Sequence, residues 1–202
     1  YDMCFWHYRA LMMNKYPVNL SIDYSETSDK STAFIRLILV IPVLIVLGML
    51  SSIGALLFPV LLLILFKQKY PKWWFDWNVA LTNFSLRVIA YGLLMRDEYP
   101  SSDEDQAVHV DIPYPDVEKD LDKWKPLYKW FLAIPHIIIL CFLEIGVVLC
   151  SVFVWFAILF TGRYPKGVFD FVEGVLRWSL RVTAYAILLT TDEYPPFRLG
   201  EQ

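Results

Sequence analysis

A stretch that occurs twice constrains the fold of this chain more than any other feature. The later copy contains Arg163-Tyr164-Pro165-Lys166, Ser179-Leu180-Arg181 and Asp192-Glu193-Tyr194-Pro195. The earlier copy contains Lys69-Tyr70-Pro71-Lys72, Ser85-Leu86-Arg87 and Asp97-Glu98-Tyr99-Pro100, at an offset of about 94 positions. A fixed period of this kind indicates a duplicated unit. We therefore expect two tandem copies of one module.

The similarity continues upstream and sets the expected domain boundaries. Residues 18–24 match residues 108–114, and Ile41-Pro42 matches Ile134-Pro135. The segment between the copies is short, polar and acidic, which is typical of a linker. We expect an N-terminal appendage at 1–13, a first repeat at 14–100, an acidic linker at 101–107, a second repeat at 108–197 and a C-terminal tail at 198–202.

The composition indicates a membrane protein. Hydrophobic residues make up 57% of the 202 positions and charged residues only 19%, which departs from the average soluble domain. A net charge of -3, with no tract of arginine and lysine, argues against nucleic acid as a partner. Cys4, Cys141 and Cys150 have no paired spacing, so neither a disulfide nor a metal site is expected.

Each repeat opens with alternating apolar residues, which predicts a short strand. The two strands either pair with each other, offer an edge to another subunit, or are extended segments on a membrane surface. The alternating residues are Val18, Leu20, Ile22 and Tyr24 in the first repeat and Val108, Val110, Ile112 and Tyr114 in the second.

A long apolar run follows each strand, over 32–66 and 127–161. As a single helix, each run would be about 50 Å long, beyond the roughly 30 Å hydrocarbon core of a bilayer. We therefore expect a break near Gly48 to Gly54 and near Glu144 to Gly146, so that each run forms a transmembrane helical hairpin. Two hairpins give four membrane helices.

The third element of each repeat, near 72–95 and 167–190, is predicted to be an amphipathic helix with one polar stripe. Basic residues flank both apolar runs and are absent from both expected hairpin tips, which favours cytoplasmic polar segments and an interfacial position for this helix. A third span per repeat is the alternative, so four or six spans remain open. The expected fold is an all-α integral membrane protein.

The polar stripe supplies the first candidates for a binding site. Arg87 and Arg181 occupy equivalent positions, and each has a tyrosine four residues later. A guanidinium binds a lipid phosphate or a partner's carboxylate well, whereas the alternative is that both arginines pair internally and orient the helix. The candidate lipid- or partner-binding residues are Arg87, Arg181, Tyr91, Tyr185, Arg177 and Glu173, of which the last two form an i,i+4 pair.

Two ionisable residues lie in the second apolar run. Glu144 is a functional candidate because a charged group at membrane depth is costly, although the expected hairpin places it at a solvent-facing tip. His136 has no second histidine at ligand spacing, so we expect a satisfied or interfacial side chain and no metal.

The chain carries no motif that indicates catalysis. It has no glycine-rich phosphate loop, no HExxH and no GxSxG, so neither an enzyme nor a cofactor is expected. The repeated Asp-Glu-Tyr-Pro ends are interpreted as helix stops and exposed turns.

The second repeat resembles a known family. The resemblance rests on the string from Trp155 to Gly167, on Leu176 to Tyr185 and on the end from Asp192 to Phe197. These residues are similar to the bacterial membrane family called domain of unknown function 4389, and repeat one resembles a diverged second copy with Gln68-Lys69 in place of Gly-Arg. The resemblance implies a bacterial inner-membrane protein with no established activity.

Taken together, these patterns predict a non-catalytic, multi-pass accessory or scaffold subunit of the bacterial inner membrane. Its expected partners are membrane lipids and a larger membrane protein complex. The alternative hypothesis is a lipid-interacting or small-solute carrier with a path between the two repeats.

Overall fold

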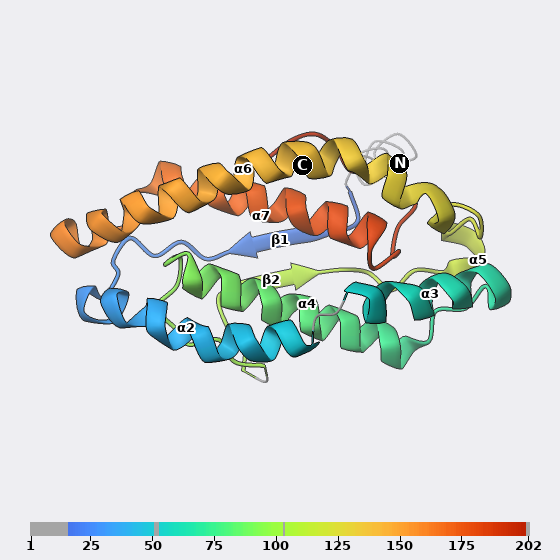
Figure 1. The fold of residues 1–202 in the computed structure, drawn as a ribbon, viewed down its shortest axis with the longest axis horizontal. Helices are drawn as coiled ribbons and strands as arrows, with labels where there is room; N and C mark the ends of the chain where they lie inside the picture. Colours follow the sequence, from blue (N-terminus) through green and yellow to red (C-terminus); the bar gives the residue numbers. More distant parts are fainter. Residues whose placement is uncertain (1–15, 51–52, 103, 201–202) are drawn as a thin grey trace, which may run out of the picture.

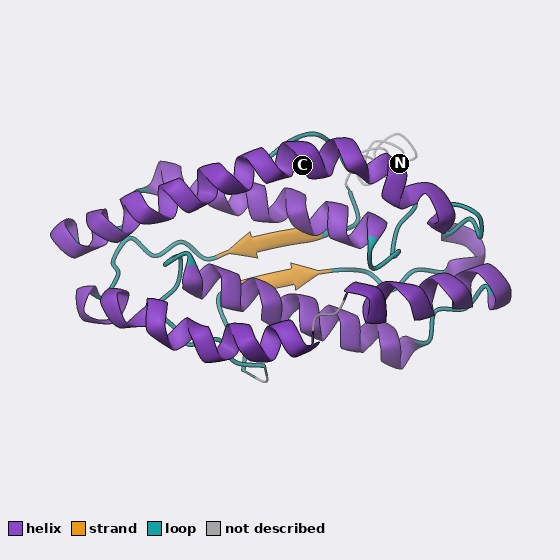
Figure 2. Ribbon diagram, in the orientation of Figure 1, coloured by secondary structure: helices purple, strands orange, loops and turns teal. Residues whose placement is uncertain are grey.

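Long helices run side by side over a small sheet in this protein (Figures 1 and 2). The computed structural model describes residues 16–50, 53–102 and 104–200, so the expected appendage at 1–13 and the end of the expected tail lie outside the described residues. The elements are β1 (Asn19–Ile22), α2 (Lys30–Leu50), α3 (Ile53–Lys67), α4 (Lys72–Gly92), β2 (Val108–Asp111), α5 (Val117–Asp120), α6 (Pro126–Thr161) and α7 (Lys166–Ala186).

The two predicted strands pair with each other. β1 and β2 are antiparallel, with Leu20 opposite Val110 and Ser21 opposite His109. Because successive side chains of a strand point to opposite faces, Leu20 and Ile22 are buried on one face while Asn19 and Ser21 lie on the other. The sheet therefore has one apolar face toward the helices and one polar face.

Each strand packs on the helices of the other repeat. β1 contacts α7 and β2 contacts α4. The Tyr24 hydroxyl donates a hydrogen bond to the Tyr164 carbonyl at 2.7 Å, and the Tyr114 hydroxyl donates to the Tyr70 carbonyl in the equivalent place. The Tyr70 hydroxyl donates in turn to the Leu188 carbonyl at 3.0 Å, and burial raises the pKa of Tyr70 to about 12. The two repeats are thus interlocked.

The helices form two layers on the apolar face of the sheet (Figure 1). α4 and α7 make the inner layer, and α2, α3 and α6 lie outside them, with α2 packed on α4 and α6 packed on α7. The core lies mainly around α7, where Val172, Ala184 and the following Leu189 are fully buried.

The expected helical hairpins are wrong. α6 is one continuous helix from Pro126 to Thr161, and it passes through Pro135 and the predicted break at Gly146. A single glycine costs only about 1 kcal/mol in a helix relative to alanine, and Gly146 lies against Phe171 of α7. α2 and α3 follow each other along the long axis instead of folding back (Figure 1), and residues 51–52 between them lie outside the described residues.

The expected all-α, multi-pass membrane fold is also wrong. A sheet joins the repeats, and within the described ranges α6 is the one helix long and apolar enough to cross a membrane, by length and composition alone. The run in repeat one is divided between α2 and α3. The predicted helices at 72–95 and 167–190 do form, as α4 and α7, but α7 is largely buried between β1 and α6 and not interfacial.

The outer helices of both repeats end on a residue with a left-handed backbone. Gly162 follows α6 with φ of 72°, and Gln68 follows α3 with φ of 46°. Glycine adopts this conformation without steric cost, whereas glutamine does so at a cost. The second repeat therefore has Gly162-Arg163 where the first has Gln68-Lys69, but the backbone turns in the same left-handed way after both outer helices.

The strand register gives a direct test of the interlocked fold. With the native cysteines replaced by serine, Ser21→Cys together with His109→Cys is expected to form an intrachain disulfide in high yield. Directly paired antiparallel residues have Cα atoms about 4.5–5.5 Å apart, within disulfide range. Non-reducing electrophoresis after proteolysis between the repeats measures the yield. Asn19→Cys with His109→Cys is the out-of-register control, and an equal yield there would contradict the register.

Candidate functional site

The two equivalent arginines bind main-chain carbonyls of their own chain. Arg87 Nη1 donates to the carbonyls of Ser101 and Glu104, both at 2.8 Å. Arg181 donates from Nη1 and Nη2 to carbonyls in the segment 198–200 at 3.2 and 3.0 Å. Each guanidinium therefore holds the segment that follows its own repeat, which corresponds to the internal pairing considered from the sequence.

Burial makes the Arg181 position unusual for a cation. The side chain is 1% exposed, and its pKa is lowered by burial first and then by the charges of Arg177 and Arg198. A buried guanidinium surrounded by carbonyls is costly to move. Arg181 therefore holds structure and has little surface to offer a lipid phosphate.

Glu173 and Arg177 together hold strand β1. They form the predicted i,i+4 ion pair at 2.9 Å. Arg177 Nε donates to the Leu20 carbonyl at 2.8 Å, while the Ile22 amide donates to Glu173 Oε1 at 2.9 Å. The pair thus supplies hydrogen-bond partners to one backbone amide and one backbone carbonyl of β1, and its charges face the interior of the protein.

Tyr91 and Tyr185 lie beneath buried cations. The Arg36 guanidinium carbon is 5.9 Å from the centre of the Tyr91 ring, and Lys129 Nζ is 5.2 Å from the centre of the Tyr185 ring. Burial is the main cause that raises the pKa of Tyr185, and nearby Asp192 adds to it. Both tyrosines therefore belong to an equivalent polar cluster in each repeat.

The centre of each cluster is an ion pair that sequence reasoning missed. Arg36 Nη2 lies 2.6 Å from Asp97 Oδ1, and Lys129 Nζ lies 2.6 Å from Asp192 Oδ1. Both cations are fully buried. Lys129 Nζ also donates to the Thr191 carbonyl at 2.8 Å.

The aspartates also bind the start of the outer helix of their own repeat. The Asp29 amide donates to Asp97 Oδ2 at 2.9 Å, and the Asp122 amide donates to Asp192 Oδ2 at 2.7 Å. The Asp192 side chain is only 10% exposed, so the interpretation of Asp-Glu-Tyr-Pro as an exposed turn is wrong for this residue. One pattern in the sequence could have pointed to these buried cations. Arg36 precedes Pro42 by the same number of residues as Lys129 precedes Pro135.

His136 is buried, but only one of its two ring nitrogens is satisfied, because Nε2 is buried without a hydrogen-bond partner among the described residues. Trp178 Nε1 donates to His136 Nδ1 at 3.0 Å, and the Phe197 ring stacks on the imidazole with centres 3.9 Å apart. Within the described part of the chain, no group of three or more His, Cys, Asp or Glu side chains is placed to hold a metal ion.

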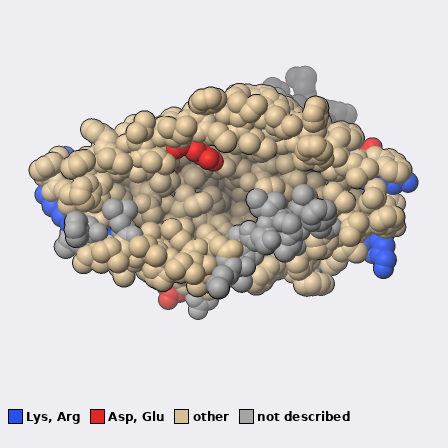
Figure 3. All heavy atoms as spheres, in the orientation of Figure 1, with Lys and Arg blue, Asp and Glu red and all other residues tan. Residues whose placement is uncertain are grey.

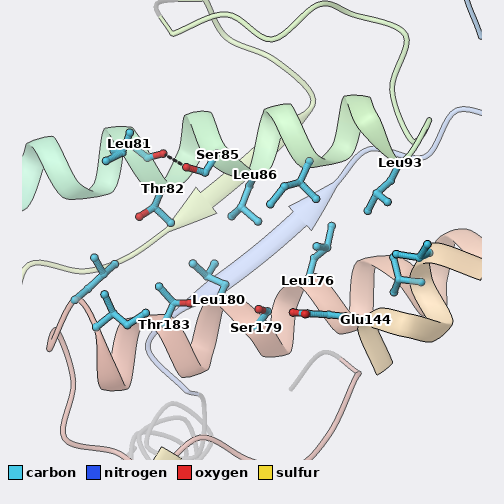
Figure 4. Close-up of a pocket in the computed structure, with 15 residues that line it drawn as sticks. Leu81, Thr82, Ser85, Leu86, Leu93, Glu144, Leu176, Ser179, Leu180 and Thr183 are labelled. Carbon is cyan, nitrogen blue, oxygen red and sulfur yellow. Dashed lines mark hydrogen bonds between the residues drawn. The ribbon is translucent and has the colours of Figure 1, made fainter. Parts of the chain in front are cut away.

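A groove opens between α4 and α7, the equivalent inner helices (Figure 4). Its volume is about 490 Å³, and its lining is mostly aliphatic, with leucine and isoleucine on both sides and Val147 and Val148 of α6. Glu144 also lines it, and Figure 4 shows the carboxylate pointing toward Ser179. The hairpin-tip position expected for Glu144 is wrong, because the residue lies in the middle of the continuous helix α6.

Comparison with known families agrees with the resemblance seen in the sequence. The family described as "Domain of unknown function (DUF4389)" matches residues 30–102 and 124–198. The chain belongs to this family. Both repeats are matched, so the protein carries two tandem copies of the DUF4389 domain. No curated protein and no solved structure gave a match.

The buried ion pair at Asp192 is expected to contribute strongly to stability. Asp192→Asn leaves the Lys129 charge uncompensated in the interior, which costs about 3–5 kcal/mol for a buried pair. Asp170→Asn breaks an exposed pair with Lys166 in the same repeat, which is worth about 0–1 kcal/mol. Denaturant unfolding of both variants in one mild detergent measures the difference. Equal losses would show that Asp192 does not stabilise a buried charge.

Proposed function

We propose that this protein is a non-catalytic, membrane-associated scaffold whose outer helical layer lies within one leaflet of a bilayer. The apolar surface of α6 and α2 is the observation that carries the proposal. On α6, Phe131 is 62% exposed, Phe142 72% and Phe160 79%, so large apolar groups face outward along the whole helix. An apolar patch of this size is typical of a protein or membrane contact.

The opposite side of the molecule is polar. The outward face of the sheet carries Asn19 and Ser21 from β1 and His109 and Asp111 from β2. The layers therefore run from a polar sheet through the buried inner helices to an apolar outer layer. This polarity across the thickness of the molecule favours a position flat on a membrane.

The length of the apolar surface argues for a helix in the membrane plane. α6 has 36 residues and is about 54 Å long, whereas the hydrocarbon core is about 30 Å thick. If α6 crossed the bilayer lengthwise, exposed phenylalanines near both ends would face water. A single layer of helices is about 10–12 Å thick and therefore fits within one leaflet. In that position all the exposed phenylalanines of α6 lie in lipid.

The charged residues fit the same position. Figure 3 shows Lys and Arg side chains at the two ends of the apolar face and a largely uncharged surface between them. Trp124 just before α6 and Trp130 near its start are each 57% exposed, and tryptophan favours the headgroup level of a membrane. The long side chains of these lysines and arginines can reach the headgroups while the apolar face between them lies at one depth in the leaflet.

The scaffold role needs a surface for a protein partner, and the polar sheet face supplies it. With the outer layer in lipid, the exposed side chains of Asp23, His109 and Asp111 remain on the water side. Their grouping around β2 offers acidic and imidazole groups to a basic partner surface. The larger complex expected from the sequence is proposed to bind there.

Depth measurements along α6 test the in-plane position. Spin labels on Phe131→Cys, Phe142→Cys, Phe153→Cys and Phe160→Cys, in a background without native cysteines, are expected to report similar depths in one leaflet of lipid vesicles. Each site is at least 59% exposed, so a label replaces no buried side chain. The measurement compares collisions with oxygen in the hydrocarbon and with a nickel chelate in water.

A label at His109 on the sheet is the control and is expected to collide mainly with the water-soluble chelate. A depth profile that peaks at Phe142 and falls toward both ends would mean that α6 crosses the bilayer. Labels on α6 that all remain accessible to the chelate would overturn membrane insertion altogether.

A further inference from the structure

The groove between α4 and α7 has the shape and lining of a site for an apolar chain. Leu81 of α4 and Leu93 just after this helix mark the extent of the groove on one side, and Leu176 of α7 and Leu188 just after that helix mark it on the other. A span of about 12 helical residues corresponds to about 18 Å, enough for an extended hydrocarbon chain. The volume of about 490 Å³ lies within the usual range of about 300–1,000 Å³ for small-molecule sites.

The hydroxyl protons of the groove that are not already donated within the protein are gathered on one side. Thr82 and Ser85 of α4 donate to carbonyls of their own helix at 2.7 and 2.6 Å, so these hydroxyl protons are already used. Ser179 and Thr183 of α7 line the groove with no protein partner among the described residues. A ligand therefore meets free hydroxyls on α7 and an apolar wall on α4.

Glu144 adds a negative charge beside those hydroxyls. Within the described part of the chain, no lysine or arginine pairs with its carboxylate. An unpaired carboxylate in apolar surroundings attracts a cation and repels an anion, and ionised hydrogen-bond partners are the strong ones. Figure 4 shows the carboxylate directed into the groove beside Ser179, where the head of a ligand would lie.

We propose that this groove binds a single-chain amphiphile with a positively charged amine headgroup. The hydrocarbon chain lies between the leucines of α4 and α7, and the ammonium group donates to the Glu144 carboxylate and to the Ser179 hydroxyl. This inference goes beyond the scaffold function, because binding in the groove does not require α6 to lie in the membrane plane.

Three probes of equal chain length test the headgroup preference. Dodecylamine, dodecanol and dodecanoate are titrated into the full chain in a non-ionic detergent, at a pH where the amine is protonated, and binding is followed by calorimetry. The amine is expected to bind about tenfold more tightly than the alcohol, as one charge-assisted hydrogen bond predicts, with dodecanoate the weakest. Equal affinities for amine and alcohol would overturn the proposal.

Three variants test whether the groove and Glu144 are responsible for the preference for the amine over the alcohol. Glu144→Gln keeps the shape of the side chain and is expected to bring the affinity for dodecylamine down to that for dodecanol. Asp170→Asn removes an exposed carboxylate of α7 outside the groove and is expected to leave the preference intact. Thr183→Phe fills the groove and is expected to weaken amine and alcohol alike.

Two results would place binding elsewhere. A preference for the amine that survives in Glu144→Gln would exclude Glu144 as the headgroup partner. Unchanged affinities in Thr183→Phe would exclude the groove as the site of the chain, provided that circular dichroism shows both variants folded.

Discussion

The exchange of strands between the repeats is the constraint on which the rest of the structure depends. Backbone donors and acceptors of a strand must be paired when the strand is covered by helices. β1 meets this need through β2 on one side and through Glu173 and Arg177 of α7 on the other. Neither repeat supplies both partners for its own strand, so each repeat completes the other.

The buried ion pairs extend this interlocking to the outer layer. Asp97 and Asp192 follow the inner helices α4 and α7, yet each binds a buried cation and a backbone amide at the start of an outer helix. Because an unpaired buried charge is costly, these contacts hold the ends of the layers together. Between those ends, the inner helices are left far enough apart to form the groove.

Membrane association and the groove are linked through α6. The outward side of this helix is the apolar surface that we place in lipid, and Glu144 near its middle lines the groove. The hollow visible on the apolar face in Figure 3 therefore opens toward the proposed lipid phase. An amphiphile would then reach the carboxylate from the bilayer without passing through water.

The sequence by itself determined the duplication, the two strands, the inner helices and the Glu173–Arg177 pair, because repeats, alternation and i,i+4 spacing are local patterns. It also predicted the family correctly. Only the tertiary structure decided that the apolar runs do not fold back, since α6 packs as one helix against α7 and also contacts α2 and α3 of the other repeat. Likewise, the pairing of Lys129 with Asp192 joins residues far apart in the chain, and no local spacing encodes such a contact. The sequence shows that Glu144 is an ionisable residue in an apolar run, but its place in the groove depends on helices from both repeats.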